Sequence, residues 1–171
     1  MSERPEQATE QLFGPSAEGF RQVLGNFATG VTVVTAVDGD RPVGVAANSF
    51  TSVSLDPPLV LFCVGRTSTT WPVIEACGQF AVNILGDHQE DLSRLFATPG
   101  ADRFAGVDWH RSAGGMPVLH DSLAYLDCTT WAVYDGGDHL IVVGRVLDLG
   151  VTRAGGPLVF FQGRYGRISD A

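Results

Sequence analysis

Short runs of β-branched and aliphatic residues, separated by glycine, proline and aspartate, recur along most of this chain. The first run, 31–37, ends at Asp38-Gly39, a dipeptide typical of tight hairpin turns, and residues 43–48 are predicted to form the returning strand. Seven strands are predicted in all, over residues 31–37, 43–48, 59–64, 80–85, 123–134, 140–149 and 157–164. A chain so rich in short strands is constrained to a mainly-β fold.

Helical spacing of apolar residues is confined to three short segments. The first begins at Ser16, a favourable N-cap, and is expected to end near Gly30. Its apolar stripe consists of Phe20, Val23, Leu24 and Phe27. The other two helices are expected over residues 71–77, with Thr70 as the cap, and from Asp87 to about residue 97.

These helices do not alternate regularly with the strands, which disfavours a doubly wound parallel sheet. An antiparallel barrel with a few short peripheral helices fits better. We expect residues 1–15 to form a flexible N-terminal tail and residues 16–171 to form a single domain, because no linker or internal repeat interrupts the pattern.

All eleven basic residues are arginine, and the formal net charge is −8. The absence of lysine excludes a lysine Schiff base and the lysine of a P-loop. The acidic balance argues against nucleic-acid binding. Three separated cysteines and four unpaired histidines favour neither a disulfide framework nor a metal site. With no apolar segment long enough for a membrane helix and no signal peptide, the sequence predicts a cytoplasmic protein.

Two strips rich in hydroxyl and amide donors are the strongest chemical feature. Residues 44–54 combine small side chains with Asn48 and several serines and threonines, and residues 66–70 read Arg-Thr-Ser-Thr-Thr. Backbone amides and hydroxyls can hold a phosphate group without lysine, and Arg66 or Arg103 could add charge-assisted contacts. The alternative is that these residues simply fill loops and caps. Neither a G-x-S-x-G hydrolase elbow nor a Rossmann G-x-G-x-x-G follows a strand.

Five ordered blocks of the sequence resemble the short-chain flavin reductases, the reductase components of two-component flavin-dependent monooxygenases. The resemblance covers roughly residues 18–167. Its blocks span residues 27–35, 44–60, 80–85, 137–146 and 157–166, and include Gly137-Asp-His139 and Gly163-Arg-Tyr-Gly166. The sequence departs from the family pattern at Gln162, where many relatives carry arginine. The resemblance implies a Greek-key split β-barrel of the FMN-binding type, usually a homodimer with the flavin near the interface.

The resemblance also implies a set of cofactor contacts. Polar residues after the second strand would line the flavin, residues 63 and 64 would run beside the isoalloxazine ring, and the 68–70 strip would lie near the phosphate. Arg103 and Phe104 would lie at the ribityl-phosphate or adenylate end, and His139 would contact the nicotinamide nucleotide, although a histidine here could also be a simple turn residue. The full expected set is Thr32, Ala47, Asn48, Ser49, Phe50, Thr51, Ser52, Cys63, Val64, Ser68, Thr69, Thr70, Asn83, Arg103, Phe104, His139 and Tyr165.

The resulting prediction is an NAD(P)H:flavin oxidoreductase that reduces FMN or FAD and releases the reduced flavin to a separate monooxygenase or halogenase. No catalytic side chain is required, because hydride transfer from NADH or NADPH to a flavin is the cofactors' own chemistry. Three alternatives remain open: a non-catalytic flavin or haem binder on the same barrel, an oxidase that retains FMN, and a purely structural barrel. Neither nucleic acid nor a membrane is expected as a partner.

Overall fold

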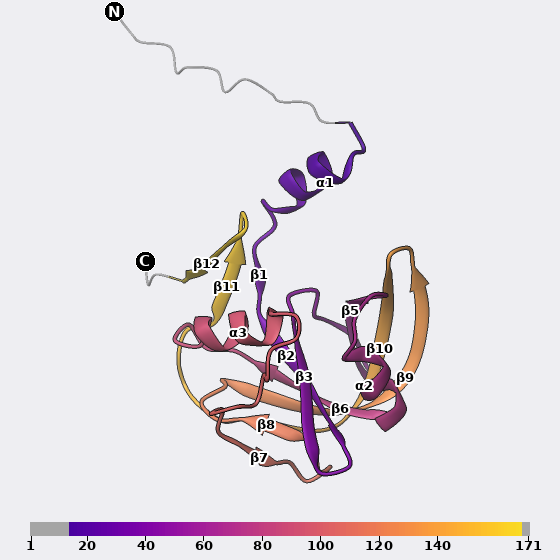
Figure 1. Cartoon of the computed structure of the whole chain (residues 1–171), viewed down its shortest axis with the longest axis vertical. Coiled ribbons are helices and arrows are strands. Elements are labelled where there is room, and N and C mark those ends of the chain that lie inside the picture. Colours follow the sequence, from indigo (N-terminus) through magenta and orange to yellow (C-terminus); the bar gives the residue numbers. More distant parts are fainter. Residues whose placement is uncertain (1–13, 169–171) are drawn as a thin grey trace, which may run out of the picture.

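The computed structural model describes residues 14–168, and the predicted tail up to residue 13 lies outside the described residues. Strands dominate, with short helices at the periphery (Figure 1). The helices are α1 (Ala17–Leu24), α2 (Trp71–Cys77) and α3 (Glu90–Ala97). The strands are β1 (Thr29–Gly30), β2 (Thr32–Asp38), β3 (Arg41–Ala47), β4 (Thr51–Leu55), β5 (Pro58–Gly65), β6 (Gln79–Ile84), β7 (Trp109–Arg111), β8 (Pro117–Leu119), β9 (Ala124–Gly136), β10 (His139–Val151), β11 (Leu158–Phe161) and β12 (Arg164–Arg167).

Seven strands form one antiparallel sheet in the order β3-β2-β6-β9-β10-β5-β4. β11 joins β1 and β12 in a small second sheet, and β7 pairs with β8. The large sheet curls until its edge strand β3 approaches β5, but no backbone ladder joins these two strands. The predicted antiparallel barrel is therefore confirmed, and its split lies between β3 and β5.

β9 and β10 form the longest hairpin, which projects beyond the barrel (Figure 1). Its tight turn contains Gly137 at a φ of 79°, a conformation that glycine adopts without steric cost. Lower in the hairpin the register shifts next to Gly144, where an added Cβ would lie 2.5 Å from the ring of Phe80. The bulges and this close approach let the two long strands bend around the core.

The core contains two apolar clusters inside the curled sheet. In the first, the ring of Phe62 meets Trp71 and Phe80 edge-on, with centroids 6.1 and 5.4 Å apart. In the second, Leu85 and Phe96 pack with residues that include Leu158. α2 lies against the first cluster and α3 against the second, because Trp71 and Phe96 are buried on their inner faces.

The first helix is shorter than predicted. Ser16 caps it as expected, its Oγ accepting a bond from the Gly19 amide at 3.1 Å. The helix ends at Leu24 rather than near Gly30, because Gly25 caps it and Asn26 Nδ2 donates to the Gln22 carbonyl. The chain then extends into β1, which pairs with β11.

The second helix has the predicted bounds, and Thr70 occupies its N-cap position as predicted. Thr70 makes no side-chain cap bond, and Ser68 Oγ accepts from the Trp71 amide instead. The third helix has Gln89 as its N-cap residue and begins at Glu90, so the predicted start at Asp87 is wrong. The backbone at Asp87 bonds to the Gly156 carbonyl instead of entering the helix.

The predicted last strand, 157–164, is too long, and the strand β12 that follows it was not predicted. β11 ends at Phe161, and Gln162 and Gly163 turn the chain with φ values of 48° and 75° before β12 begins. β7 lies within residues 98–115, where the sequence predicts no strand. Within residues 14–168, no helix combines the length and apolar character needed to cross a membrane.

Candidate functional site

The split between β3 and β5 is bridged by one side chain. Ser49, in the segment that leaves β3, accepts a hydrogen bond from the Cys63 amide at 2.9 Å and donates to the Cys63 carbonyl at 3.1 Å. The hydroxyl thus occupies the place that a neighbouring backbone would take in a continuous sheet. It holds the two strands together while leaving space on either side of the bridge.

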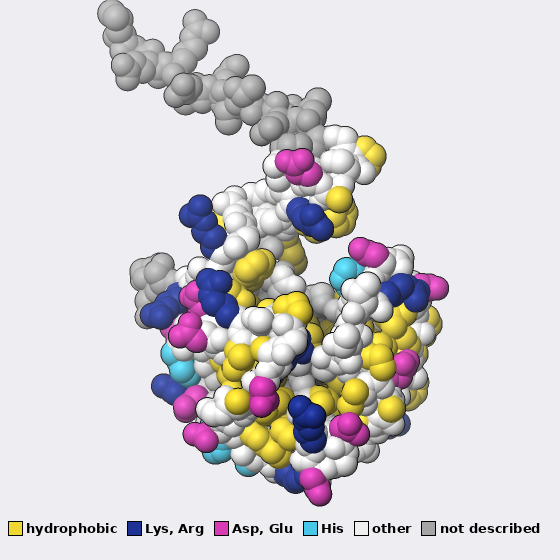
Figure 2. Space-filling view, viewed as in Figure 1, with side chains coloured by type: hydrophobic (Ala, Val, Ile, Leu, Met, Phe, Trp, Pro, Cys, Tyr) yellow, Lys and Arg dark blue, Asp and Glu magenta, His cyan; other side chains and the backbone are white. Residues whose placement is uncertain are grey.

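A cavity of about 600 Å³ opens beside this bridge, a volume typical of cofactor sites. Its wall from β3 includes the small side chains of Ala46 and Ala47, which allow a flat ring to approach the strand. Figure 2 shows the hollow between α1 and the tip of the β9–β10 hairpin. The cavity is lined by Phe20, Val45, Ala46, Ala47, Asn48, Ser49, Phe62, Cys63, Val64, Gly65, Ser68, Gly136, Asp138 and His139.

The rim on the hairpin side carries a histidine–aspartate pair. His139 Nδ1 lies 2.8 Å from Asp138 Oδ1, and this hydrogen bond lowers the pKa of the Asp138 carboxyl below its ordinary value. A Cβ added at Gly65 would lie 3.8 Å from His139 Nε2, so the ring stands beside the end of β5. With Nδ1 bonded to the carboxylate, Nε2 is the nitrogen free to face a ligand in the cavity.

Arg66 does not face a phosphate position. Its Nε donates to the Gly137 carbonyl at 2.8 Å, and its guanidinium pairs with Asp135. The Arg66 amide also donates to the Asp138 carbonyl at 3.0 Å. This arginine therefore braces the hairpin that carries His139, and the expectation that it contacts a phosphate group is not supported.

A second cavity of about 290 Å³ lies at the other end of β3, where Thr69, Thr70 and Gly44 form part of its wall. Arg103 lines it and donates to the Gly44 carbonyl at 2.7 Å and to Thr70 Oγ1 at 2.8 Å, while its other nitrogens bond to the Thr98 carbonyl. Within residues 14–168, all its hydrogen-bond partners are uncharged oxygens. Burial lowers its pKa from the ordinary value, yet the group stays charged at neutral pH. An anionic ligand group would compensate this guanidinium.

A third cavity, of about 160 Å³, shares Ala46, Ala47 and Asn48 with the first. Tyr165 lines it and is held firmly, because its hydroxyl lies 2.9 Å from Ser93 Oγ and the Arg94 guanidinium lies 4.8 Å from its ring centroid. All three cavities therefore meet β3, which forms a wall common to them.

The expected cofactor residues divide among these cavities. Seven line the first: Ala47, Asn48, Ser49, Cys63, Val64, Ser68 and His139. Four line the second: Thr69, Thr70, Arg103 and Phe104. Tyr165 lines the third. The remaining five, which line none of the three, are Thr32, Phe50, Thr51, Ser52 and Asn83.

The side chains of Thr32 and Asn83 are hydrogen-bonded to other parts of the protein and line none of the three cavities. Thr32 Oγ1 donates to the Ala47 carbonyl at 2.7 Å and so fixes the end of β3. Asn83 is fully buried; its amide nitrogen donates to the Val33 carbonyl and its oxygen accepts from the Leu119 amide at 2.8 Å. Both support the cavity wall from behind.

The other three lie on or before the edge strand β4. Thr51 and Ser52 are exposed and pair with Leu61 and Val60 of β5. Phe50 packs against the first core cluster. In the chain as described, these side chains stabilise the outer edge of the split without facing its cavity.

Seven residues of the first cavity lie outside the expected set, namely Phe20, Val45, Ala46, Phe62, Gly65, Gly136 and Asp138. Phe20 was assigned only to the apolar stripe of a helix, and Asp138 was noted only within the Gly-Asp-His block. The sequence signal for Phe20 is weak, because the apolar stripe of a helix usually packs against the protein core and does not line a cofactor cavity.

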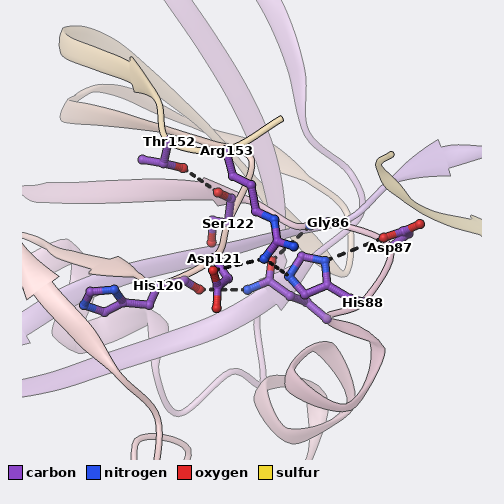
Figure 3. A network of polar contacts seen from close by, with 9 residues as sticks. Gly86, Asp87, His88, His120, Asp121, Ser122, Thr152 and Arg153 are labelled. Atoms are coloured by element: carbon purple, nitrogen blue, oxygen red, sulfur yellow. Dashed lines mark hydrogen bonds and ion pairs between the residues drawn. The ribbon is translucent and has the colours of Figure 1, made fainter. Parts of the chain in front are cut away.

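The described chain provides no metal centre, because no three His, Cys, Asp or Glu side chains within residues 14–168 are placed to hold an ion. Figure 3 shows a polar cluster outside the cavities along β3, where Arg153 donates to Asp121 at 3.0 Å and approaches His88. Thr152 bonds to the Ser122 carbonyl in the same cluster, and Gln89 joins it to the start of α3. These contacts connect the ends of secondary-structure elements.

Residues 24–169 match the model of the flavin reductase like domain. The chain belongs to this family. It is 50% identical over 148 residues to the flavin-dependent monooxygenase reductase subunit HsaB of Mycobacterium tuberculosis, covering 85% of this chain and 79% of the relative. The predicted family and its split-barrel fold are therefore confirmed, and the protein is an oxidoreductase of the flavin reductase type.

Solved structures of other flavin reductases agree with this fold. Nitrilotriacetate monooxygenase component B from Mycobacterium thermoresistibile has a TM-score of 0.86 and 48% identity, covering 89% of this chain and 86% of that one. The NADH:FAD oxidoreductase SgcE6 of Streptomyces globisporus, in complex with NAD and FAD fragments, has a TM-score of 0.88 and 41% identity, covering 94% and 98%. That neighbour therefore holds NAD and FAD fragments on the same fold.

Proposed function

We propose that this flavin reductase uses NADH to reduce FMN or FAD in the cavity between β3 and β5, and releases the reduced flavin to a separate monooxygenase or halogenase. The observation that carries the proposal is the cavity of about 600 Å³, with a small-residue wall at Ala46 and Ala47 and a polar rim. The reductase subunits among its relatives support a partner oxygenase.

The residues present fit a flavin. Ala46 and Ala47 leave room for a ring against β3, and the backbone beside Cys63 is already fixed by Ser49. Asn48 offers an amide that can both donate and accept at the ring edge. When bound, the flavin supplies the redox chemistry by accepting a hydride from the nicotinamide.

The protein's own contribution is placement and exclusion of water. His139 stands at the rim, where Nε2 can contact the nicotinamide nucleotide, and Asp138 fixes the orientation of its ring. Val64 and Phe62 make the inner wall apolar, which excludes water from the space between two stacked rings. The described side chains are not required to donate or accept a proton for the hydride to move.

The second cavity is proposed to receive the flavin phosphate or the adenylate of FAD. Thr69 offers a hydroxyl, and Arg103 offers a positive charge that its neutral partners leave uncompensated. Arg41 adds a second positive charge to the lining of this cavity, and the carboxylates of Asp38 and Asp102 oppose these two charges. An anion held by so few positive charges can be released, as a reductase that passes on its product requires.

A homodimer is the proposed assembly. β9 and β10 carry large apolar side chains exposed to solvent, including Trp131 at 52%, Leu149 at 63% and Val151 at 85%. A second copy would cover such a surface. Sedimentation equilibrium of the purified chain tests this assembly. The proposal treats residues 16–171 as one domain and places the enzyme in the cytoplasm with its NADH supply.

Anaerobic mixing with each nucleotide and each flavin tests the proposed function. We expect NADH to bleach free FMN or FAD in many turnovers, and gel filtration to separate the reduced flavin from the protein. A flavin or haem binder would retain its cofactor without turnover. An oxidase would keep FMN bound and would reduce it with a substrate other than a nicotinamide nucleotide. Either pattern would contradict the proposal.

A further inference from the structure

α1 lies outside the barrel, yet one of its side chains lines the main cavity. Figure 1 shows the helix separated from the body of the sheet. Phe20 lines the cavity across from His139, although 65% of its surface is exposed. The hydrogen bond from His139 lowers the pKa of Asp138, and the charge of Arg21 on α1 adds to this effect. Both residues place α1 beside the cavity.

A short chain of hydrogen bonds fixes the root of this helix. The Gln162 amide donates to the Gly25 carbonyl at 2.9 Å, and Gln162 Nε2 donates to Asn26 Oδ1 at 2.8 Å. Asn26 Nδ2 in turn donates to the Gln22 carbonyl at 2.9 Å, in the last turn of α1. The tip of the β11–β12 hairpin is thereby joined to the C-terminal end of the helix.

The side chain of Gln162 is suited to this contact by its backbone. With a φ of 48°, the residue stands at the first position of a two-residue turn and points its amide toward Asn26. The turn itself favours asparagine or glycine at such a φ. Glutamine here therefore costs conformational energy, and its extra methylene gives the amide the reach to meet Asn26.

We propose that Gln162 is a positioning residue that holds α1 across the cavity, so that Phe20 covers the mouth opposite His139. Its effect on flavin exchange rests on the function proposed above. Its effect on access to the cavity is independent of that function, because the bonds from Gln162 to the helix root form within the chain and involve no cofactor. Loss of the side-chain contact lets α1 swing away and opens the cavity to solvent and ligands.

Alkylation of Cys63 tests this proposal without any catalytic assay. Cys63 lines the cavity, whereas Cys77 does not and serves as an internal reference. Burial raises the pKa of the third thiol, Cys128, to about 12, with a smaller contribution from Asp127, so it stays unreactive near neutral pH. Peptide mass spectrometry after timed exposure to iodoacetamide gives the rate at each cysteine.

The test variant is Gln162→Asn in the full chain, which keeps a residue suited to the turn but shortens the amide. We expect the Cys63 rate to rise about threefold to tenfold, the range for loss of one hydrogen bond, with Cys77 unchanged. Phe20→Ala should give the same rise, and the double variant no further rise. Gln22→Ala, an exposed amide on α1, should change neither rate. An unchanged Cys63 rate in Gln162→Asn, with Phe20→Ala raising it, would overturn the role of Gln162.

Flavin binding separates this proposal from the proposed function. In Gln162→Asn we expect the FMN dissociation rate to rise by a similar factor while kcat at saturating substrates stays within about twofold. If the wild type lacks NADH:flavin activity, the proposed function fails, and the Cys63 rates still decide the position of α1. If wild-type activity is present and neither the Cys63 rate nor flavin dissociation changes in the variant, only the inference about Gln162 fails.

Discussion

Ser49 and Cys63 join two strands that have no backbone ladder between them. One hydroxyl accepts from the Cys63 amide at 2.9 Å and donates to its carbonyl at 3.1 Å. Two antiparallel strands joined by a backbone ladder would close the sheet along the whole edge. A single side-chain bridge closes it at one point, and the cavity that lies along the rest of the seam is available to a cofactor.

Replacement of Ser49 by alanine should therefore affect both stability and binding. The Cys63 amide and carbonyl lose their partner, so we expect the free energy of unfolding to fall by about 1–3 kcal/mol. The flavin affinity of the folded protein should also fall, because the cavity wall beside Cys63 loosens. Urea unfolding and FMN titration measure the two effects. Ser52→Ala, on exposed β4, is the control, and equal behaviour of the two variants would contradict the assigned bridge.

The Asp138–His139 pair predicts a specific pH dependence. Its hydrogen bond to His139, the main cause, keeps the pKa of Asp138 below the ordinary value of about 4. The stabilising interaction is therefore fully present above that value and is lost as the pH falls through the lowered pKa. Carbon NMR of the Asp138 carboxyl should show this low midpoint, and His139→Ala should move it upward. An unchanged midpoint would show that the pair does not form in solution.

The same pair should influence NADH more than flavin. We expect Asp138→Asn to raise the KM for NADH about threefold to tenfold, because His139 loses the partner that orients its ring. His139→Gln keeps a polar side chain and should retain part of the affinity. Stopped-flow titrations with each cofactor separate the two. A loss of flavin affinity with unchanged NADH kinetics would contradict this assignment.

Arg103 should act on both stability and phosphate recognition. Its bonds to the Gly44 carbonyl and Thr70 hydroxyl pin the 98–104 loop to β3, so Arg103→Ala should lower the free energy of unfolding by about 1–2 kcal/mol. Arg41→Ala should leave stability unchanged, because Arg41 is exposed. Both variants should reduce the ratio of the affinity for FMN to the affinity for riboflavin, because riboflavin lacks the phosphate. An undiminished preference in both would contradict the anion site.

Asn83 should prove to be a scaffold residue. Asn83→Ala removes the partner of the buried Leu119 amide and a donor to the Val33 carbonyl, so we expect a loss of about 2–4 kcal/mol in unfolding free energy. Flavin affinity of the folded fraction should stay within about twofold of the wild type. Chemical unfolding and fluorescence titration test the two statements. A selective loss of flavin binding would return Asn83 to the site.

The sequence predicts the fold well where a signal is local. The hairpin of β2 and β3 is visible in its β-branched residues and in Asp38-Gly39, although the turn lies one residue later, at Gly39 and Asp40, where Gly39 adopts a positive φ. By contrast, Gln162-Gly163 is an unusual turn dipeptide, so the predicted strand runs through the turn to residue 164 and β12 is not predicted. The first helix was extended because Phe27 continues its apolar stripe, while the cap formed by Gly25 ends it earlier.

The residues of the candidate site are likewise predicted where the sequence signal is local or the family resemblance locates them. The donor strip at Asn48 and Ser49 was found because polar residues gather where a strand ends, and the resemblance to flavin reductases located His139. The structural role of Asn83 could not be predicted from sequence, because its partner, the Leu119 amide, lies 36 residues away. Phe20 reaches the cavity only through the placement of α1, which depends on contacts from the far end of the chain.

Steady-state oxidation of NADH at varied FMN, in the wild type and in Ala47→Phe, tests the central claim most directly. Ala47 belongs to the wall that a flat ring must approach, and a phenyl group would occupy that space. The account predicts flavin-dependent turnover in the wild type and a loss of at least about tenfold in kcat/KM for FMN in a variant that still unfolds cooperatively. Undiminished turnover in Ala47→Phe, or no flavin-dependent oxidation by the wild type, would contradict it.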